Sequence, residues 1–181
     1  MFSFYLKNAK RVNNWDLVDA SASQIVGEYL VNDERETKTP PSVPPLIGEG
    51  KRIPLPPIRG ETERGVQSRL ALLTTLARSP NLWERRIAIV ATFAFIRANR
   101  FKETIHLATL LLNDKHDLIH KATGWMLREV GKREMLAYGN TPLLKKFLNQ
   151  HHPTMPRTML RYAIEKLNKK ERRHYINARP L

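Results

Sequence analysis

The chain has 181 residues, with 31 Lys or Arg against 17 Asp or Glu, so its net charge is +14. Residues 121–181 carry 14 basic and 4 acidic side chains, a local charge of +10, which favours polyanionic partners. The absence of cysteine excludes disulfides and Cys-ligated metal sites, and fits an intracellular protein. No apolar run approaches the ~20 residues that span a bilayer, so nucleic acid is favoured over a membrane.

Helical periodicity follows the chain almost throughout, and no segment alternates in the manner of a strand. The exception is 32–64, which holds seven of the 12 prolines and is expected to be a loop or a disordered insertion. The predicted helices cover 2–12, 15–30 with a break near Ser21, 66–78, 81–99, 101–112, 115–132, 142–151, 154–167 and 169–177.

Paired helices joined by short loops predict an all-α fold, an αα array such as HEAT-like repeats. The N-terminal helical pair (1–31), the Pro-rich insertion (32–64) and the repeat region (65–181) are expected to form one domain. Pro142 and Pro153 each follow a polar residue and are interpreted as helix starts.

Trp15 and Asp19 lie four residues apart in a predicted helix, so their side chains share one face. A flat aromatic surface beside a lone carboxylate suits a planar, positively charged ligand. A core tryptophan and a helix-capping aspartate explain the same two residues.

The segment 81–97 is apolar almost all round after its first turn, which predicts a central helix. Arg86 stands where its buried part begins. It either pairs with a carboxylate, the commoner outcome for an arginine near a core, or faces a groove, where its planar fork suits phosphate.

Gly124 lies in the middle of a predicted helix, where glycine costs ~1 kcal/mol relative to alanine. Close approach of another backbone, from a neighbouring helix or a nucleic-acid strand, would offset that cost. Lys121 and Arg128 flank Trp125 at helical spacing. This fits a surface that binds a nucleic-acid backbone with an aromatic platform, and equally a core tryptophan with snorkelling neighbours.

Arg157 and Arg161 are a further pair at i, i+4 within the basic C-terminal third, and together with its lysines they resemble a phosphate-tracking face. His116 and His120 have the spacing of two zinc ligands. No Glu follows His116 and no third ligand is evident, so no metal site is predicted.

Several blocks in the same order give the chain a resemblance to a known family. They are Asn-Asn-Trp-Asp-Leu-Val-Asp (13–19), Leu-Trp-Glu-Arg-Arg-Ile-Ala (82–88), Lys-Ala-Thr-Gly-Trp-Met-Leu-Arg-Glu-Val-Gly-Lys (121–132) and Thr-Met-Pro-Arg-Thr-Met-Leu-Arg-Tyr-Ala (154–163). With these blocks the sequence resembles the DNA alkylation-repair glycosylases of the AlkD type. The resemblance covers 1–31 and about 66–177, and leaves out the Pro-rich insertion.

The resemblance implies a right-handed HEAT-like superhelix whose basic groove cups duplex DNA, and excision of cationic N3- or N7-alkylated purines. It implies that Trp15 and Trp125 face the lesion, that Asp19 is the catalytic carboxylate and that Arg86 lies near it in the groove. We expect a monofunctional glycosylase that acts as a monomer on duplex DNA containing alkylated purines. No cofactor is expected. No strong general acid is required either, because a cationic purine is already a good leaving group.

One departure from the family leaves an alternative open. Family members carry several helices before the segment that begins here at Phe2, and those helices supply the other half of the groove. The alternatives are a non-catalytic, truncated helical-repeat module that binds DNA or a protein, and a scaffold whose charge is incidental. Convergence of Trp15, Asp19, Arg86 and Trp125 on one concave surface would favour the glycosylase.

Overall fold

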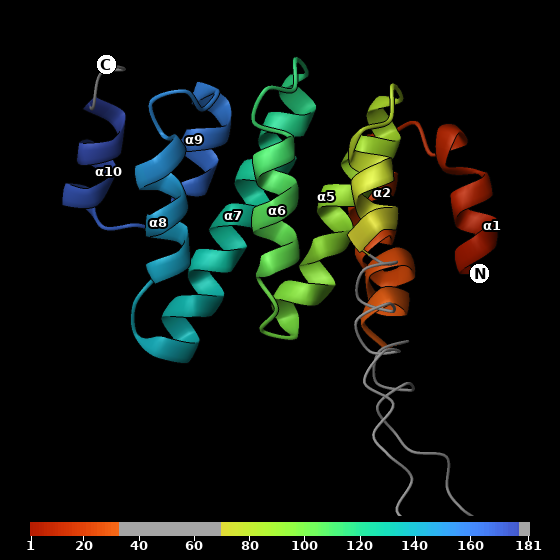
Figure 1. Cartoon of the computed structure of the whole chain (residues 1–181), viewed down its shortest axis with the longest axis horizontal. Coiled ribbons are helices and arrows are strands. Elements are labelled where there is room, and N and C mark those ends of the chain that lie inside the picture. Colours follow the sequence, from red (N-terminus) through yellow and green to blue (C-terminus); the bar gives the residue numbers. More distant parts are fainter. Residues whose placement is uncertain (33–69, 178–181) are drawn as a thin grey trace, which may run out of the picture.

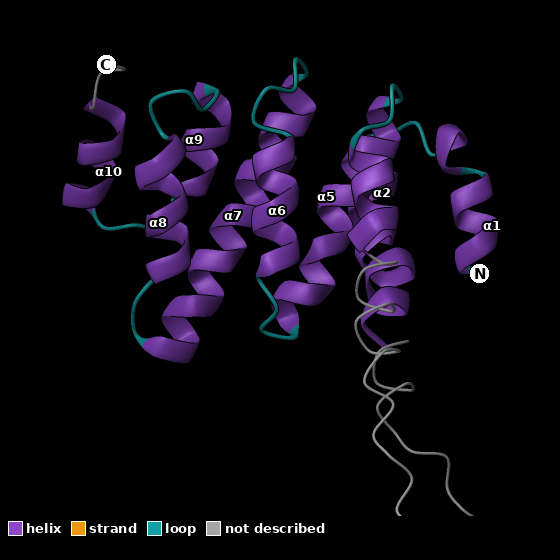
Figure 2. Cartoon of the chain, in the orientation of Figure 1, coloured by secondary structure: helices purple, strands orange, loops and turns teal. Residues whose placement is uncertain are grey.

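A computed structural model of the protein describes residues 1–32 and 70–177. Within these residues all the regular structure is helical, as Figure 2 shows, so the predicted all-α class is confirmed. The Pro-rich insertion predicted at 32–64 lies outside the described residues, apart from Asn32 at the end of a helix.

The helices follow the chain in the order in which Figure 1 labels them. They are α1 (Phe2–Lys7), the 3₁₀ turn η1 (Ala9–Arg11), α2 (Trp15–Ala22), the π-helical turn η2 (Ser23–Gly27), helical residues 28–32 and 70–77, α5 (Leu82–Arg97), α6 (Lys102–Leu110), α7 (Asp117–Tyr138), α8 (Pro142–His151), α9 (Arg157–Ala163) and α10 (Lys169–Asn177).

These helices stack side by side as a linear αα array, with α1 at one end and α10 at the other (Figure 1). In one layer α5 packs between α2 and α7, and α7 packs in turn against α9. In the other layer α6 packs on α5 and α7, and α8 packs on α7. This arrangement is the predicted helical repeat array, in which each helix contacts mainly its neighbours.

The apolar core runs along the array as two clusters, one from α1 to α7 and the other from α6 to α10. The central helix is α5, as its apolar composition predicted, because its buried residues include the unbroken run 86–92. Polar groups in its middle turns are therefore held against other helices.

Several helix starts were predicted correctly because the residues that cap a helix lie next to it in the sequence. The side-chain oxygens of Asn14 and Asn81 accept backbone N–H groups two residues further on, at 3.2 and 2.8 Å. Pro142 opens α8 as predicted. There the buried carboxylate of Glu134 accepts the next two backbone N–H groups, at 2.8 and 3.0 Å.

Other predicted boundaries were wrong: the helix predicted at 2–12 ends at Lys7, before a separate 3₁₀ turn, and the one predicted at 154–167 ends at Ala163. Two further errors have a clear physical reason. No helix begins at Pro153: α8 ends at His151 and α9 begins at Arg157. Proline disfavours the α conformation in the residue before it, so Pro156 prevents a helix from running on from 153. The helix predicted to end at 132 continues to Tyr138, where Gly139 takes the left-handed conformation (φ 69°) that ends many helices.

The close approach expected at Gly124 is made by a neighbouring helix. A Cβ atom on this residue would lie 2.5 Å from the Met159 carbonyl oxygen and 2.6 Å from the Tyr162 Cβ atom, both on α9. Gly124 thus lets α7 and α9 approach more closely than any side chain would allow, which brings Tyr162 close to the face of α7 that carries Trp125.

Candidate active site

The first half of the candidate site is an ion pair between two helices. Asn14 fixes the start of α2, so Trp15 and Asp19 project from its first two turns. Arg86 on α5 reaches Asp19 with two parallel hydrogen bonds, from Nε to Oδ1 at 2.9 Å and from Nη2 to Oδ2 at 2.7 Å. This bidentate geometry holds the carboxylate in one orientation.

Arg86 also ties this pair to a third helix. Its Nη1 atom donates to the carbonyl oxygen of Leu118, in the first turn of α7. The Arg86 side chain is 5% exposed and that of Asp19 is 20% exposed, so the arginine is enclosed while the carboxylate keeps access to solvent. Of the two alternatives left open for Arg86, the structure shows the pairing with a carboxylate. Arg86 also borders a groove, but its guanidinium is already engaged by Asp19 and Leu118.

The second half of the site comes from α7, which carries Trp125, and from α9, which carries Tyr162; Trp15 faces it from α2. Trp125 is partly buried and packs at a tilt against Phe93, with ring centroids 6.1 Å apart. Trp15 is 54% exposed. The two tryptophans are therefore neither core residues nor isolated surface residues, and each keeps part of its ring open to the groove.

Together these side chains enclose a cavity of about 380 Å³. The cavity draws its lining from four helices, α2, α5, α7 and α9. Its lining residues are Trp15, Asp19, Arg86, Leu118, Lys121, Trp125, Arg128 and Tyr162. All four residues predicted to be catalytic, and two of the four predicted to bind DNA, are thus brought together.

The two basic residues beside Trp125 are each matched by a carboxylate. Lys121 Nζ lies 2.7 Å from Asp117 Oδ2, and the hydrogen bond to Asp117 raises the pKa of Lys121 above its ordinary value. Arg128 forms ion pairs with Glu165 and Glu129. Asp117 and Glu165 are exposed, so a phosphate could replace these two carboxylates at little cost, whereas Glu129 is buried and keeps its contact with Arg128.

Arg157 and Arg161 are exposed on α9 but do not line this cavity. Arg157 Nη2 donates to the carbonyl oxygen of Ile176, 3.2 Å away, which ties α9 to α10. Their assignment to DNA binding stays a prediction. The described residues contain no group of three His, Asp or Glu side chains that could hold a metal ion.

Two contributors to the site were not predicted. The Leu118 carbonyl could not be, since its role depends on the packing of α7 against α5. Tyr162 lies within the matched block 154–163, and it stands three residues after Met159 and one before Ala163, both buried. That spacing places Tyr162 at the edge of the buried face of α9, a signal that the sequence did contain.

Comparison with known protein families identifies one match. A family model described as "DNA alkylation repair enzyme" matches residues 1–40 and 59–167. Searches of curated proteins and of solved structures gave no significant match. Among the described helices, none combines the length and the apolar character needed to cross a membrane.

Proposed function

Because the chain belongs to the DNA alkylation repair enzyme family, we propose that it is a monofunctional DNA glycosylase. Its substrates are cationic N3- or N7-alkylated purines in duplex DNA, and it hydrolyses their N-glycosidic bond. The observation that carries the proposal is the convergence of Trp15, Asp19, Arg86 and Trp125 on one cavity.

The chemistry needs few groups. When the bond between C1′ and the purine nitrogen breaks, its electron pair neutralises the cationic base, so no general acid is required. The sugar becomes oxocarbenium-like, and one fixed carboxylate stabilises that charge. Asp19 takes this role and orients a water molecule. The water oxygen bonds to C1′ and its proton passes to solvent.

The other residues prepare the carboxylate and receive the base. Arg86 holds Asp19 with two hydrogen bonds, so no free energy is spent on orienting it during the reaction. The open faces of Trp15 and Trp125 attract a cationic purine by ~0.5–2 kcal/mol each. A neutral purine lacks that attraction and is also a poorer leaving group. Alkylated bases are therefore favoured both in binding and in cleavage of the N-glycosidic bond.

DNA binding is assigned to the cations around this cavity. Lys121 and Arg128 stand at its wall, and Arg157 and Arg161 extend the basic surface along α9. Contacts of this kind release counterions from DNA, so the affinity should fall steeply with salt. We place the protein inside the cell, acting on DNA as a monomer.

The test is release of 7-methylguanine from alkylated duplex DNA by the full chain. Asp19→Asn should lower the rate by about 10²–10³-fold, as expected for loss of a group that stabilises transition-state charge. DNA affinity should change little. Asp16→Asn is the matched control, because Asp16 is exposed on the same helix and does not line the cavity. Equal release by the wild type and Asp19→Asn would refute the role of Asp19.

A specific observation supports a second candidate, a non-catalytic DNA-binding module. Both carboxylate oxygens of Asp19 already accept hydrogen bonds from Arg86, as they would in a purely structural ion pair. This candidate predicts no base release by the wild-type chain, together with DNA binding that weakens as salt is raised.

A further inference from the structure

Exposed apolar side chains gather where α7 turns into α8. Met135, Leu136, Tyr138 and Leu143 are 50%, 79%, 62% and 39% exposed, and all fall between positions 135 and 143. Single exposed apolar residues are ordinary, but a cluster of them marks an interaction surface. We call these four residues the α7–α8 patch.

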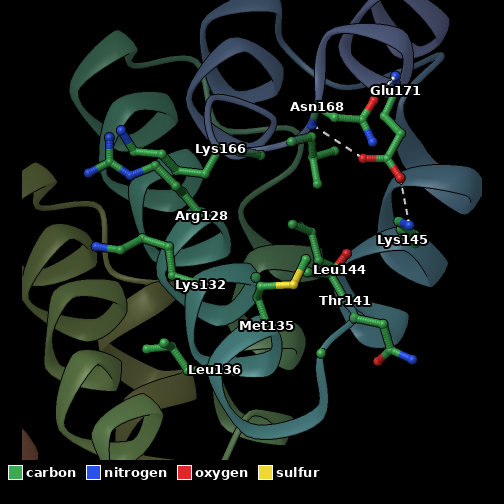
Figure 3. A pocket seen from close by; sticks show the side chains of 15 residues that line it. Arg128, Lys132, Met135, Leu136, Thr141, Leu144, Lys145, Lys166, Asn168 and Glu171 are labelled. Carbon is green, nitrogen blue, oxygen red and sulfur yellow. Dashed lines mark hydrogen bonds and ion pairs between the residues drawn. The ribbon is translucent and has the colours of Figure 1, made fainter.

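A second cavity, of about 650 Å³, opens beside this patch (Figure 3). Its apolar wall includes Met135, Leu136, Leu144, Ala163 and Leu167. The cavity follows α7 from Arg128 to Gly139, which at 1.5 Å per residue is a length of roughly 16 Å. It is therefore an elongated groove with a hydrophobic base.

Cations surround this groove. Figure 3 shows Arg128, Lys132 and Lys166 together on one side, with Lys145 across from them beside Glu171. Lys145 and Lys166 form ion pairs of 2.6 and 3.0 Å with Glu171 and Glu165, which are partly or fully exposed. Pairs of this kind are weak, so the carboxylates of a partner could replace these two glutamates. Lys132 pairs at 2.8 Å with Glu129, which is buried, so that pair is expected to persist.

The base of the groove also holds an unsatisfied polar group. Thr141 is 3% exposed and lines the groove, and its Oγ1 atom has no hydrogen-bond partner among the described residues. Buried hydroxyl groups are normally paired. This oxygen has almost no accessible surface, so a docked segment would not reach it, and docking is inferred from the apolar wall and the cations alone.

We propose that the groove and the α7–α8 patch dock an acidic amphipathic helix of a partner protein. A helix of about three turns matches the length of the groove and presents apolar side chains along one face. A second copy of this chain, with its charge of +14, fits a basic rim poorly. A small molecule fits less well, because such ligands are mostly enclosed and Leu136 is 79% exposed. The proposal does not depend on glycosylase activity.

The test uses fluorescein-labelled helical peptides of roughly 15 residues, a length at which a helix can form. One peptide has leucines on one face and glutamates on the other. Its counterparts replace the leucines by serine, or the glutamates by lysine. Binding to the full chain is followed by fluorescence anisotropy. The Leu/Glu peptide should bind, and Leu136→Asp should weaken it about tenfold or more.

Phe4→Asp is the matched control, because Phe4 is 72% exposed on α1 at the other end of the array. The affinity of this variant for the Leu/Glu peptide should match that of the wild type. The exposed position of Leu136 makes Leu136→Asp compatible with folding, which circular dichroism checks. The proposal would be overturned if the Ser/Glu peptide bound the wild type as tightly as the Leu/Glu peptide does. It would also be overturned if Leu136→Asp bound the Leu/Glu peptide as tightly as the wild type does. Binding of dodecanoate, a small apolar ligand, without binding of any peptide would overturn it in favour of a small molecule. A dimer of this chain that Leu136→Asp dissociates would overturn it in favour of a second copy.

Discussion

Gly124 provides a direct test of how α7 and α9 are held together. Alanine at this position would stabilise the helix by about 1 kcal/mol on propensity alone. Its Cβ atom would lie 2.5 Å from the Met159 carbonyl oxygen, about 0.9 Å inside the 3.4 Å at which ordinary contact begins. Because the obstructing atoms are backbone and Cβ atoms, α9 itself must move. Overpacking of this kind costs about 1–3 kcal/mol, so Gly124→Ala should be less stable than the wild type by about 1 kcal/mol.

Gly131→Ala is the matched comparison, with the same substitution in the same helix. The atom that its Cβ would meet, at 2.4 Å, is Cδ2 of Leu144, the end of a flexible side chain that can turn away. This variant should gain up to about 1 kcal/mol. Thermal unfolding, followed by circular dichroism, should place Gly124→Ala about 2–4 °C below the wild type. Equal melting temperatures for the two variants, or a Gly124→Ala variant above the wild type, would refute the packing argument.

Three other predictions concern polar groups that are buried or partly buried. Glu134→Gln should lower the free energy of unfolding by about 1–3 kcal/mol, because the amide offers one acceptor oxygen where the carboxylate accepts two backbone N–H groups. Asp19→Ala should cost roughly 3 kcal/mol, because Arg86 stays buried without its carboxylate. The double variant Asp19→Ala/Arg86→Met should lose less free energy of unfolding than the sum of the losses in the two single variants. Burial lowers the pKa of His151 from its ordinary 6.5, so stability should fall as the pH drops below that value, where the unfolded chain binds the proton more readily.

Urea titrations measure all three. Glu28→Gln, at an exposed ion pair, should leave the free energy of unfolding almost unchanged, and a similar small effect at Glu134 would contradict the capping role. Additive losses for Asp19 and Arg86 would show that the two side chains do not stabilise each other. His151→Asn should make stability less dependent on pH below 6.5, and an unchanged pH profile would rule out His151 as a cause.

Much of the fold could be predicted because its signals are local. Asn14, Asn81 and Pro142 mark helix starts through their own backbone and side-chain chemistry. The failure at Pro153 is also local, since Pro156 disfavours the α conformation of Met155, inside the first turn of a helix that began at Pro153. The π-helical turn at Ser23–Gly27 was anticipated only as a break near Ser21.

The candidate site was predictable in part for a different reason. The pairing of Trp15 with Asp19 follows from helical spacing, but the partner of Asp19 lies 67 residues away on another helix. The sequence favoured a carboxylate partner for Arg86 but left a groove position open, because spacing within one helix does not say what the next helix presents. Family resemblance added the grouping with Trp125, and only the packed helices placed Tyr162 beside it.

The three-helix contact of Arg86 bears on how the array unfolds. In a linear array each helix is stabilised mainly by its neighbours, so the ends can fray independently of the middle. Arg86 connects α2 and α7, which lie on opposite sides of α5, through one guanidinium. These helices should therefore open together, and their slow-exchanging amide protons should share one opening free energy. Residues assigned to base excision would then be exposed or protected together, as one unit, when the array opens.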